Sequence, residues 1–228
     1  MQPPAADIAR TLASGRLPGR LWLAALTRDI PVAHATTAAG QVLIAARRDS
    51  HAWLALASNG DDAGAILAVD DAPPFPESPR LGRVHLCGWV HRVAERDLHR
   101  AGLDFAAANP LHDLLDLGAD VDLFSLELGE VRLERRDTVL LEAEQFVAAT
   151  PDPLHPHERD LLQDLRDHHA DELAALVPHP RGRCLPVRLD RHGLVMATPG
   201  PHRIEFSSPA DCPGCVARAL RLTHATDS

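Results

Sequence analysis

The chain has 228 residues, of which 45% are hydrophobic and 24% are charged, which is the composition of a globular protein with one large domain or two modest ones. Its formal net charge of -9 at pH 7 argues against a nucleic-acid partner, because no basic surplus is present to neutralise phosphates. No apolar run approaches the roughly 20 residues of a membrane span, and the first residues lack the pattern of a secretory signal, so we expect a cytoplasmic protein without a membrane partner.

The first third of the chain alternates between short helical and strand patterns. One short helix is predicted at 7–14 and another from Ser50 onward. Strands are predicted at 21–26, 32–36, 42–46 and 63–69, with a turn at 38–40 between the second and the third. The proline-rich run at 72–79 is expected to be a stiff loop, because proline cannot donate to a strand ladder.

Two long strands follow, with helical segments between them. The strand at 81–93 alternates Val84, Leu86 and Gly88 with His85, Cys87 and Trp89. A helix at 95–109 is stopped by Pro110, and a helical turn is predicted at 111–117. The strand at 121–133 is expected to place one set of residues on a single face, namely Leu123, Ser125, Glu127, Gly129, Val131 and Leu133.

A proline-rich linker at 151–156 separates this region from the last third of the chain, where one histidine stands out. At about 100° per residue, a single helix would align Leu161, Leu162, Leu165, Leu173, Leu176 and Val177 on one face. His169 falls at the centre of that face and His168 at its edge. A buried imidazole must find a hydrogen-bond partner, shift its pKa or bind a ligand. His169 is therefore either a satisfied core residue or part of a site.

The four cysteines, Cys87, Cys184, Cys212 and Cys215, are too few for a disulfide scaffold in a chain of this length. Cys212-Pro213-Gly214-Cys215 opens the last predicted helix, with Asp211 as its N-cap. A helix N-terminus stabilises a thiolate, which favours redox chemistry or soft-metal binding at Cys215. The alternative is that the two cysteines are incidental small residues at a helix start.

Three motifs in the last third carry a family resemblance. They are Asp167-x-His169-Ala170-Asp171-x-Leu173, a strand ending in Asp190-x-x-Gly193-Leu194, and a corner of the form Phe206-x-x-Pro209. In this order they resemble a small α/β domain of bacterial haem-iron utilisation proteins, which also occurs in the chloroplast protein that binds glutamyl-tRNA reductase. The resemblance covers residues 157–224 and implies haem as the ligand of that domain.

The earlier region, residues 8–150, resembles the split β-barrel of the pyridoxamine-phosphate-oxidase-like, flavin-binding superfamily. Its anchors are the strand at 83–93 with Gly88, and Ser50-His51 opening a helix after the third strand. The two resemblances together predict an α+β protein in which a split barrel precedes a small α/β domain. Relatives of this barrel pair across a two-fold axis, so a homodimer is expected.

The resemblances imply two groups of candidate site residues. The candidate haem ligands are His169, His224, which continues the stripe of Val216 and Leu220, and Cys215. Close to Cys215 lies Cys212-Pro213, and a Cys-Pro pair is a known style of thiolate haem ligand. The candidates for binding haem propionates or a flavin phosphate are Arg47, Arg48, Ser50 and His51. Flavin-binding relatives have Asn where this chain has Leu54, and nearby aspartates repel phosphate, so we expect no tightly held flavin mononucleotide (FMN).

The leading functional hypothesis is therefore a cytoplasmic haem-binding protein that acts in haem trafficking, sensing or degradation. We expect weak haem turnover or none, because two strong axial ligands would block oxygen. One alternative is an FMN-dependent oxidoreductase, and another is a non-catalytic regulator that binds a partner protein. The histidines beside prolines, His155, His157 and His179, are predicted to be solvated loop residues.

Overall fold

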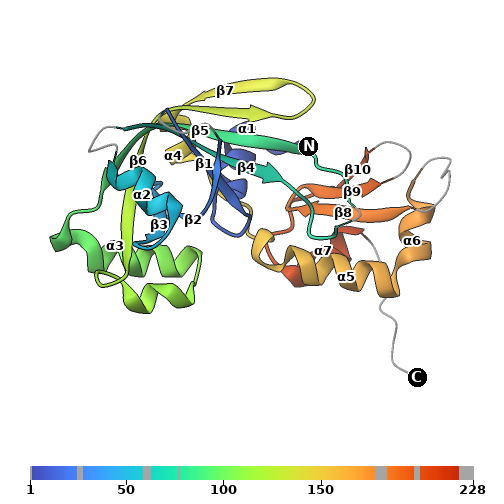
Figure 1. The fold of residues 1–228 in the computed structure, drawn as a ribbon. Helices are drawn as coiled ribbons and strands as arrows, with labels where there is room; N and C mark the ends of the chain where they lie inside the picture. The colour runs from blue at the N-terminus through green and yellow to red at the C-terminus, as the bar shows by residue number, and fades with distance from the viewer. Residues whose placement is uncertain are drawn as a thin grey trace. The chain divides into compact units, whose positions relative to one another are not determined.

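The structure, a computed structural model, describes residues 2–24, 28–58, 63–76, 78–177, 184–197 and 201–220. These residues form two compact units (Figure 1). The barrel unit comprises residues 5–71 and 81–150, and the C-terminal unit comprises residues 2–4, 72–80 and the described part of 151–228. The proline-rich loop thus belongs to the C-terminal unit although the barrel strands flank it in sequence.

The barrel unit is built on antiparallel strands that close on themselves. The strands are β1 (Gly19–Leu23), β2 (Ile30–Thr36), β3 (Val42–Arg47), β4 (Ala63–Asp71), β5 (Gly82–Arg92), β6 (Val121–Glu134) and β7 (Thr138–Glu142). Their order is β3-β2-β1-β4-β5-β6-β7, and a further pairing of β6 with β3 closes a six-stranded barrel. The expected α+β architecture with a split barrel is confirmed.

The barrel interior is filled by alternating apolar residues of these strands. In β4, for example, Ala65, Leu67 and Val69 are buried while their neighbours are more exposed. The prediction that one set of alternate residues of β6 shares a face is wrong. Phe124, Leu126, Val131 and Leu133 line the interior, whereas Leu123 belongs to a separate cluster outside it. A bulge at Gly129, opposite Cys87 and Gly88, inserts one residue and reverses the facing of the strand.

Helices cover the barrel. They are α1 (Ala5–Leu12), α2 (His51–Ser58), α3 (Glu95–Ala108), the 3₁₀ helix η1 (His112–Asp116) and α4 (Ala143–Ala148). Phe105 of α3 packs in one buried cluster with Ala35, Leu43 and Leu123. Phe146 of α4 is fully buried with residues of α1 and of the barrel interior.

The C-terminal unit is a three-stranded antiparallel sheet packed against helices (Figure 1). The strands β8 (Leu185–Asp190), β9 (Gly193–Ala197) and β10 (Pro201–Glu205) lie in the order β10-β9-β8. The helices are the 3₁₀ helix η2 (His155–His157), α5 (Glu158–His168), α6 (Ala170–Ala175) and α7 (Pro213–Leu220). Phe75 of the proline-rich loop packs against this core, and the Arg166 guanidinium lies 3.5 Å from the centroid of its ring.

The single helix predicted through Leu161–Val177 is broken at His169. This residue ends α5 and precedes α6, with φ -126° and ψ 17°, which is not helical. Two features of the sequence favour a new start here. Histidine is a weak helix former, and Asp171 and Glu172 are stabilising in the first turn of α6. His169 therefore lies at a helix junction rather than in the middle of an apolar helical face.

Among the described residues, no helix is both long enough and apolar enough to cross a bilayer.

Candidate pocket of the barrel unit

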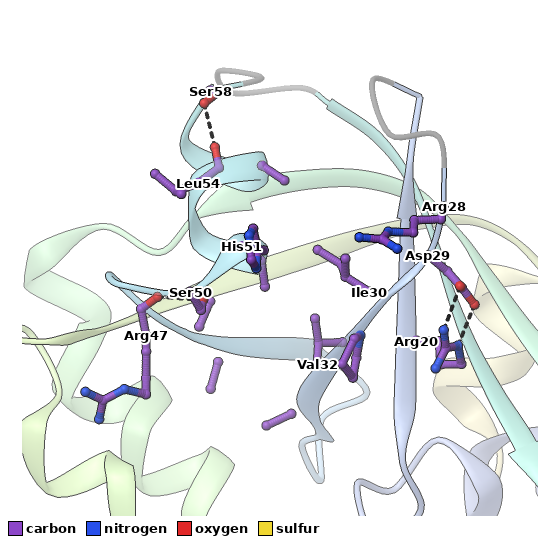
Figure 2. A pocket seen from close by; sticks show the side chains of 16 residues that line it. Arg20, Arg28, Asp29, Ile30, Val32, Arg47, Ser50, His51, Leu54 and Ser58 are labelled. Atoms are coloured by element: carbon purple, nitrogen blue, oxygen red, sulfur yellow. Dashed lines mark hydrogen bonds and ion pairs between the residues drawn. The ribbon is translucent and has the colours of Figure 1, made fainter.

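A large pocket lies on the barrel unit between α2 and the ends of β1, β2 and β3 (Figure 2). Its volume is about 940 Å³, which is at the upper end of the range for small-molecule and cofactor sites. Much of its wall is apolar. The apolar lining residues are Ile30, Pro31, Val32, Ala33, Ala45, Ala46, Ala52, Leu54 and Ala55. Leu54 is 52% exposed, so a ligand in the pocket would cover apolar surface that now faces solvent.

Two arginines at the pocket already have carboxylate partners. Arg20 donates from Nε and Nη2 to both oxygens of Asp29, at 2.5 and 2.7 Å, and these hydrogen bonds hold the pKa of Asp29 below its ordinary value. Arg47 donates to Asp49 at 3.2 and 3.4 Å. Both pairs are exposed and therefore weak, so an anionic ligand could compete for either guanidinium.

Arg28 differs from these two arginines, because it forms no ion pair or hydrogen bond with any other residue in the described part of the chain. Figure 2 shows its guanidinium directed across the pocket toward His51. Arg28 is not among the site residues that the sequence predicts. It lies between two predicted strands, and nothing in the local pattern distinguishes it from a solvated loop arginine.

Ser50 and His51 are brought into the pocket by the start of α2. The Ser50 hydroxyl donates to the Arg47 carbonyl at 2.6 Å and accepts from the Trp53 backbone N–H at 3.1 Å, so it is engaged as a helix cap. The His51 side chain is exposed and has no hydrogen-bond partner among the described residues. Its imidazole is thus available to a ligand.

Arg48 points elsewhere and does not line the pocket. Its Nη2 lies 3.0 Å from Oδ1 of the buried Asp122, which also accepts from Arg92 at 2.8 Å and from Trp53 Nε1 at 2.6 Å. Burial alone would raise the pKa of Asp122, but the hydrogen bonds from Arg48, Trp53 and Arg92 lower it to about 2. Because Trp53 belongs to α2, Asp122 fixes the helix that carries Ser50 and His51.

His169 and His168 both belong to the C-terminal unit. His169 is half-buried at the junction of α5 and α6, and its Nδ1 lies 2.9 Å from Oε2 of Glu172. A carboxylate on one ring nitrogen orients the imidazole and leaves Nε2 as the atom that could bind a metal. The neighbouring His168 is exposed and pairs with Asp164 at 3.0 Å.

The other candidate haem ligands have different surroundings. Cys215 is joined to Cys212 by a disulfide, and in that state its sulfur has no thiolate to offer to iron. His224 lies outside the described residues, as does His179.

The prediction that His155 is solvated is wrong. Its side chain is buried, and its Nδ1 lies 3.5 Å from Glu158, because η2 turns the residue back onto α5. Within the described residues, no group of three or more His, Cys, Asp or Glu side chains could hold a metal ion on its own.

Comparison with known proteins gives matches in structure alone, because no protein-family model and no curated protein matches the sequence. The heme binding protein from Mycobacterium smegmatis has a TM-score of 0.64 and 22% identity, covering 97% of this chain and 96% of that chain. A protein of unknown function from Agrobacterium tumefaciens has a TM-score of 0.50 and 16% identity, covering 98% of both chains. At these identities the likeness shows a shared fold that extends over nearly the whole chain.

Proposed function

We propose that this protein binds haem in the pocket of the barrel unit and carries or senses it in the cytoplasm. One observation carries the proposal. A pocket of about 940 Å³ with apolar walls places His51 opposite Arg28, and neither side chain has an ion-pair or hydrogen-bond partner among the described residues. This combination suits a large flat apolar ligand that has anionic groups at one edge and a metal at its centre.

The residues present fit the parts of haem. The apolar wall formed by Ile30, Val32 and Leu54 suits the porphyrin face, and Arg28 and Arg47 suit the propionates because a guanidinium binds a carboxylate through two parallel hydrogen bonds. His51 would hold the haem iron through a ring nitrogen. Bound haem would contribute an iron centre able to exchange electrons or bind oxygen. The structural likeness to a heme binding protein supports this choice of ligand.

His169 remains a second candidate ligand, in the C-terminal unit. It is supported by the contact of its Nδ1 with Glu172, since the other ring N–H of a metal-binding histidine usually donates a hydrogen bond to a carboxylate or a carbonyl. Because the two histidines belong to different units, each is tested by itself.

A haem titration followed by absorbance tests the proposal. We expect His51→Ala to weaken binding by about tenfold or more and to shift the Soret band, with His99→Ala on the exposed face of α3 as the matched control. The parallel pair in the other unit is His169→Ala against His168→Ala. If wild type and all four variants bind haem with equal affinity and identical spectra, neither histidine is a ligand.

Flavin is the second candidate ligand. The observation that favours it is the Arg28 guanidinium, which has no partner within the described part of the chain, because a flavin phosphate needs such a group. The carboxylates of Asp29 and Asp49 weigh against it, because they occupy Arg20 and Arg47 and would repel a phosphate. We therefore expect no stoichiometric flavin in the purified protein. Release of FMN on denaturation would make an FMN-dependent oxidoreductase the better proposal. A spectrum that lacks both a Soret band and a flavin band would instead favour the regulator that binds a partner protein.

We further propose that two copies pair through the outer face of the sheet. Trp22 of β1 and Trp89 of β5 are 40% and 50% exposed there, and β4 lies between them, with Ile66 paired to Trp22 and Gly64 paired to Trp89. Exposed aromatic residues on a flat face are typical of interfaces. Glu130 and Arg132 lie on the same outer face, so a two-fold copy can place opposite charges together.

Analytical ultracentrifugation tests this pairing. We expect Trp89→Glu to give a monomer, whereas Leu115→Glu, at an exposed residue of η1, should leave the dimer intact. A monomeric wild type at micromolar concentration would exclude the homodimer.

A further inference from the structure

The disulfide at the start of α7 lies outside the proposed haem function. Cys212 immediately precedes the helix, Cys215 is its third residue, and the Cα atoms of the two cysteines are 5.3 Å apart. A structural disulfide usually ties together segments that are distant in sequence, where it removes the most chain entropy. This bridge closes a loop of four residues and ties no two elements together.

The helix has other means of support. Val216 and Leu220 are buried in the core of the C-terminal unit, and Asp211, just before the bridge, forms an ion pair with Arg191. The backbone N–H of Ala210 also donates to the Arg191 carbonyl at 2.7 Å. Opening the bridge would therefore leave α7 in place, which is what a reversible redox centre requires.

The two sulfurs differ in access and in surroundings. Cys212 is exposed, whereas Cys215 is half-buried and packs against the apolar core. The Sγ atom of Cys215 also accepts a hydrogen bond from Arg218 Nη2 at 3.2 Å. A guanidinium and a helix N-terminus both stabilise a thiolate, and a sulfur that is stabilised as thiolate is a good leaving group in disulfide exchange.

We propose that Cys212 and Cys215 form a dithiol–disulfide exchange site for small thiols. A thiolate attacks the exposed Sγ of Cys212, the Cys212–Cys215 bond breaks, and Cys215 leaves as a thiolate beside Arg218. A second thiolate then attacks the mixed disulfide on Cys212, which releases an oxidised small disulfide and a Cys212 thiolate. Both cysteine thiolates can take up protons from water. In sum, two thiols and the protein disulfide give one small disulfide and the protein dithiol, and the reverse sequence oxidises the site.

The test is exchange of the folded, full-length protein with glutathione, followed by alkylation and mass spectrometry. We expect the Cys212–Cys215 pair to open with reduced glutathione and to re-form with oxidised glutathione, while Cys87 and Cys184, which are not joined in a disulfide, serve as internal references. After Cys215→Ser, Cys212 should react with oxidised glutathione, giving a mixed disulfide and one glutathione thiolate, faster than Cys215 does after Cys212→Ser. Equal rates, or opening only in denaturant, would overturn the proposal.

The role of Arg218 has its own readout. We expect Arg218→Gln to slow reduction by glutathione about twofold to fivefold, as suits one exposed charge contact, and to raise the thiol pKa of Cys215 measured by the pH dependence of alkylation. Arg96→Gln, on the exposed face of α3, is the matched control. If Arg218→Gln changes neither the rate of reduction nor the thiol pKa, the disulfide is merely exposed and is not part of an exchange site.

Discussion

The barrel unit and the C-terminal unit bury charge in different ways. In the barrel, Asp122 is buried, but its partners Arg48 and Arg92 remain largely exposed, so water still solvates the cations. In the C-terminal unit, Glu158 and Arg188 are both buried, with side chains 5% and 9% exposed. Glu158 also accepts a hydrogen bond from the Leu189 backbone at 3.0 Å, which joins α5 to β8.

This difference follows from how each unit is held together. The barrel closes through its own ladders, and its buried Asp122 fixes α2 beside the pocket. The C-terminal sheet has two edges and a smaller core, and it uses a buried ion pair between α5 and β8. Removing one partner of a buried ion pair is strongly destabilising, because the other charge is left buried and uncompensated. We therefore expect the C-terminal unit to be more sensitive to single charge changes.

The largest effect is expected for Arg188→Met. Removing the cation leaves Glu158 buried without its charged partner and should cost about 3–5 kcal/mol of stability in the C-terminal unit. Hydrogen exchange resolved by peptide should show lost protection in α5 and β8, with the barrel strands unchanged. Arg96→Gln, which removes an exposed pair with Asp97, should have little effect. Equal loss of protection in both units would contradict the expectation that the C-terminal unit is more sensitive to single charge changes.

The barrel has a buried polar group of its own, His34 of β2. Its Nε2 has no hydrogen-bond partner among the described residues, and burial lowers its pKa to about 4. Gly19 of β1 makes room for the ring, since a Cβ there would lie 2.5 Å from His34 Nδ1. His34 should thus make the barrel sensitive to acid although it carries no charge at neutral pH.

Proton linkage gives the direction in which the pH changes the stability of the barrel. Between pH 6.5 and about 4 the unfolded chain carries a proton on His34 that the folded barrel does not, so stability falls as the pH falls. The loss amounts to about 3 kcal/mol across that window and is absent above it. His34→Leu should remove this part of the pH dependence, which denaturant unfolding at pH 7 and pH 4.5 would measure. Parallel pH profiles in wild type and variant would contradict the pKa.

The secondary structure of the two units was predictable from the sequence in part. The strands of the barrel were predictable because alternation and turn residues are local signals, and β2, β3, β4 and β5 lie close to their expected positions. Which residues of β6 point into the barrel was not predictable, because the bulge at Gly129 depends on pairing with β5. The break at His169 was missed for a related reason, since apolar periodicity continues across it and only cap geometry reveals it.

The candidate site was predictable in part. Arg47, Ser50 and His51 are local neighbours, and the structure places all three at the pocket. The separation of Arg48 from them was not predictable, because its partner Asp122 lies 74 residues away in sequence. Arg28 reaches the same pocket only because β2 pairs antiparallel with β3 and places its start beside the end of β3 and α2. Long-range strand pairing thus decides which arginines can meet one ligand.

A smaller effect is expected for Asp122→Asn in the barrel. The amide keeps the shape but weakens the charge-assisted hydrogen bonds from Arg48, Arg92 and Trp53, which should cost about 2 kcal/mol. The wild-type pKa of about 2 means that this stability is present above pH 4 and is lost as the pH falls toward 2. Because Trp53 anchors α2, haem affinity should fall as well. Unchanged stability and affinity would show that Asp122 does not fix the pocket.

The smallest effect concerns the proline-rich loop at 72–80, whose assignment to the C-terminal unit separates it from its neighbours in sequence. Phe75 holds the loop through burial and through the Arg166 guanidinium 3.5 Å from its ring centroid. Phe75→Leu keeps most of the buried apolar area but removes the ring face, so about 1 kcal/mol should be lost. Amide protection should fall in α5, where Arg166 lies, while β4 and β5, which flank the loop in sequence, stay protected. Loss of protection in β4 and β5 instead of α5 would assign the loop to the barrel unit.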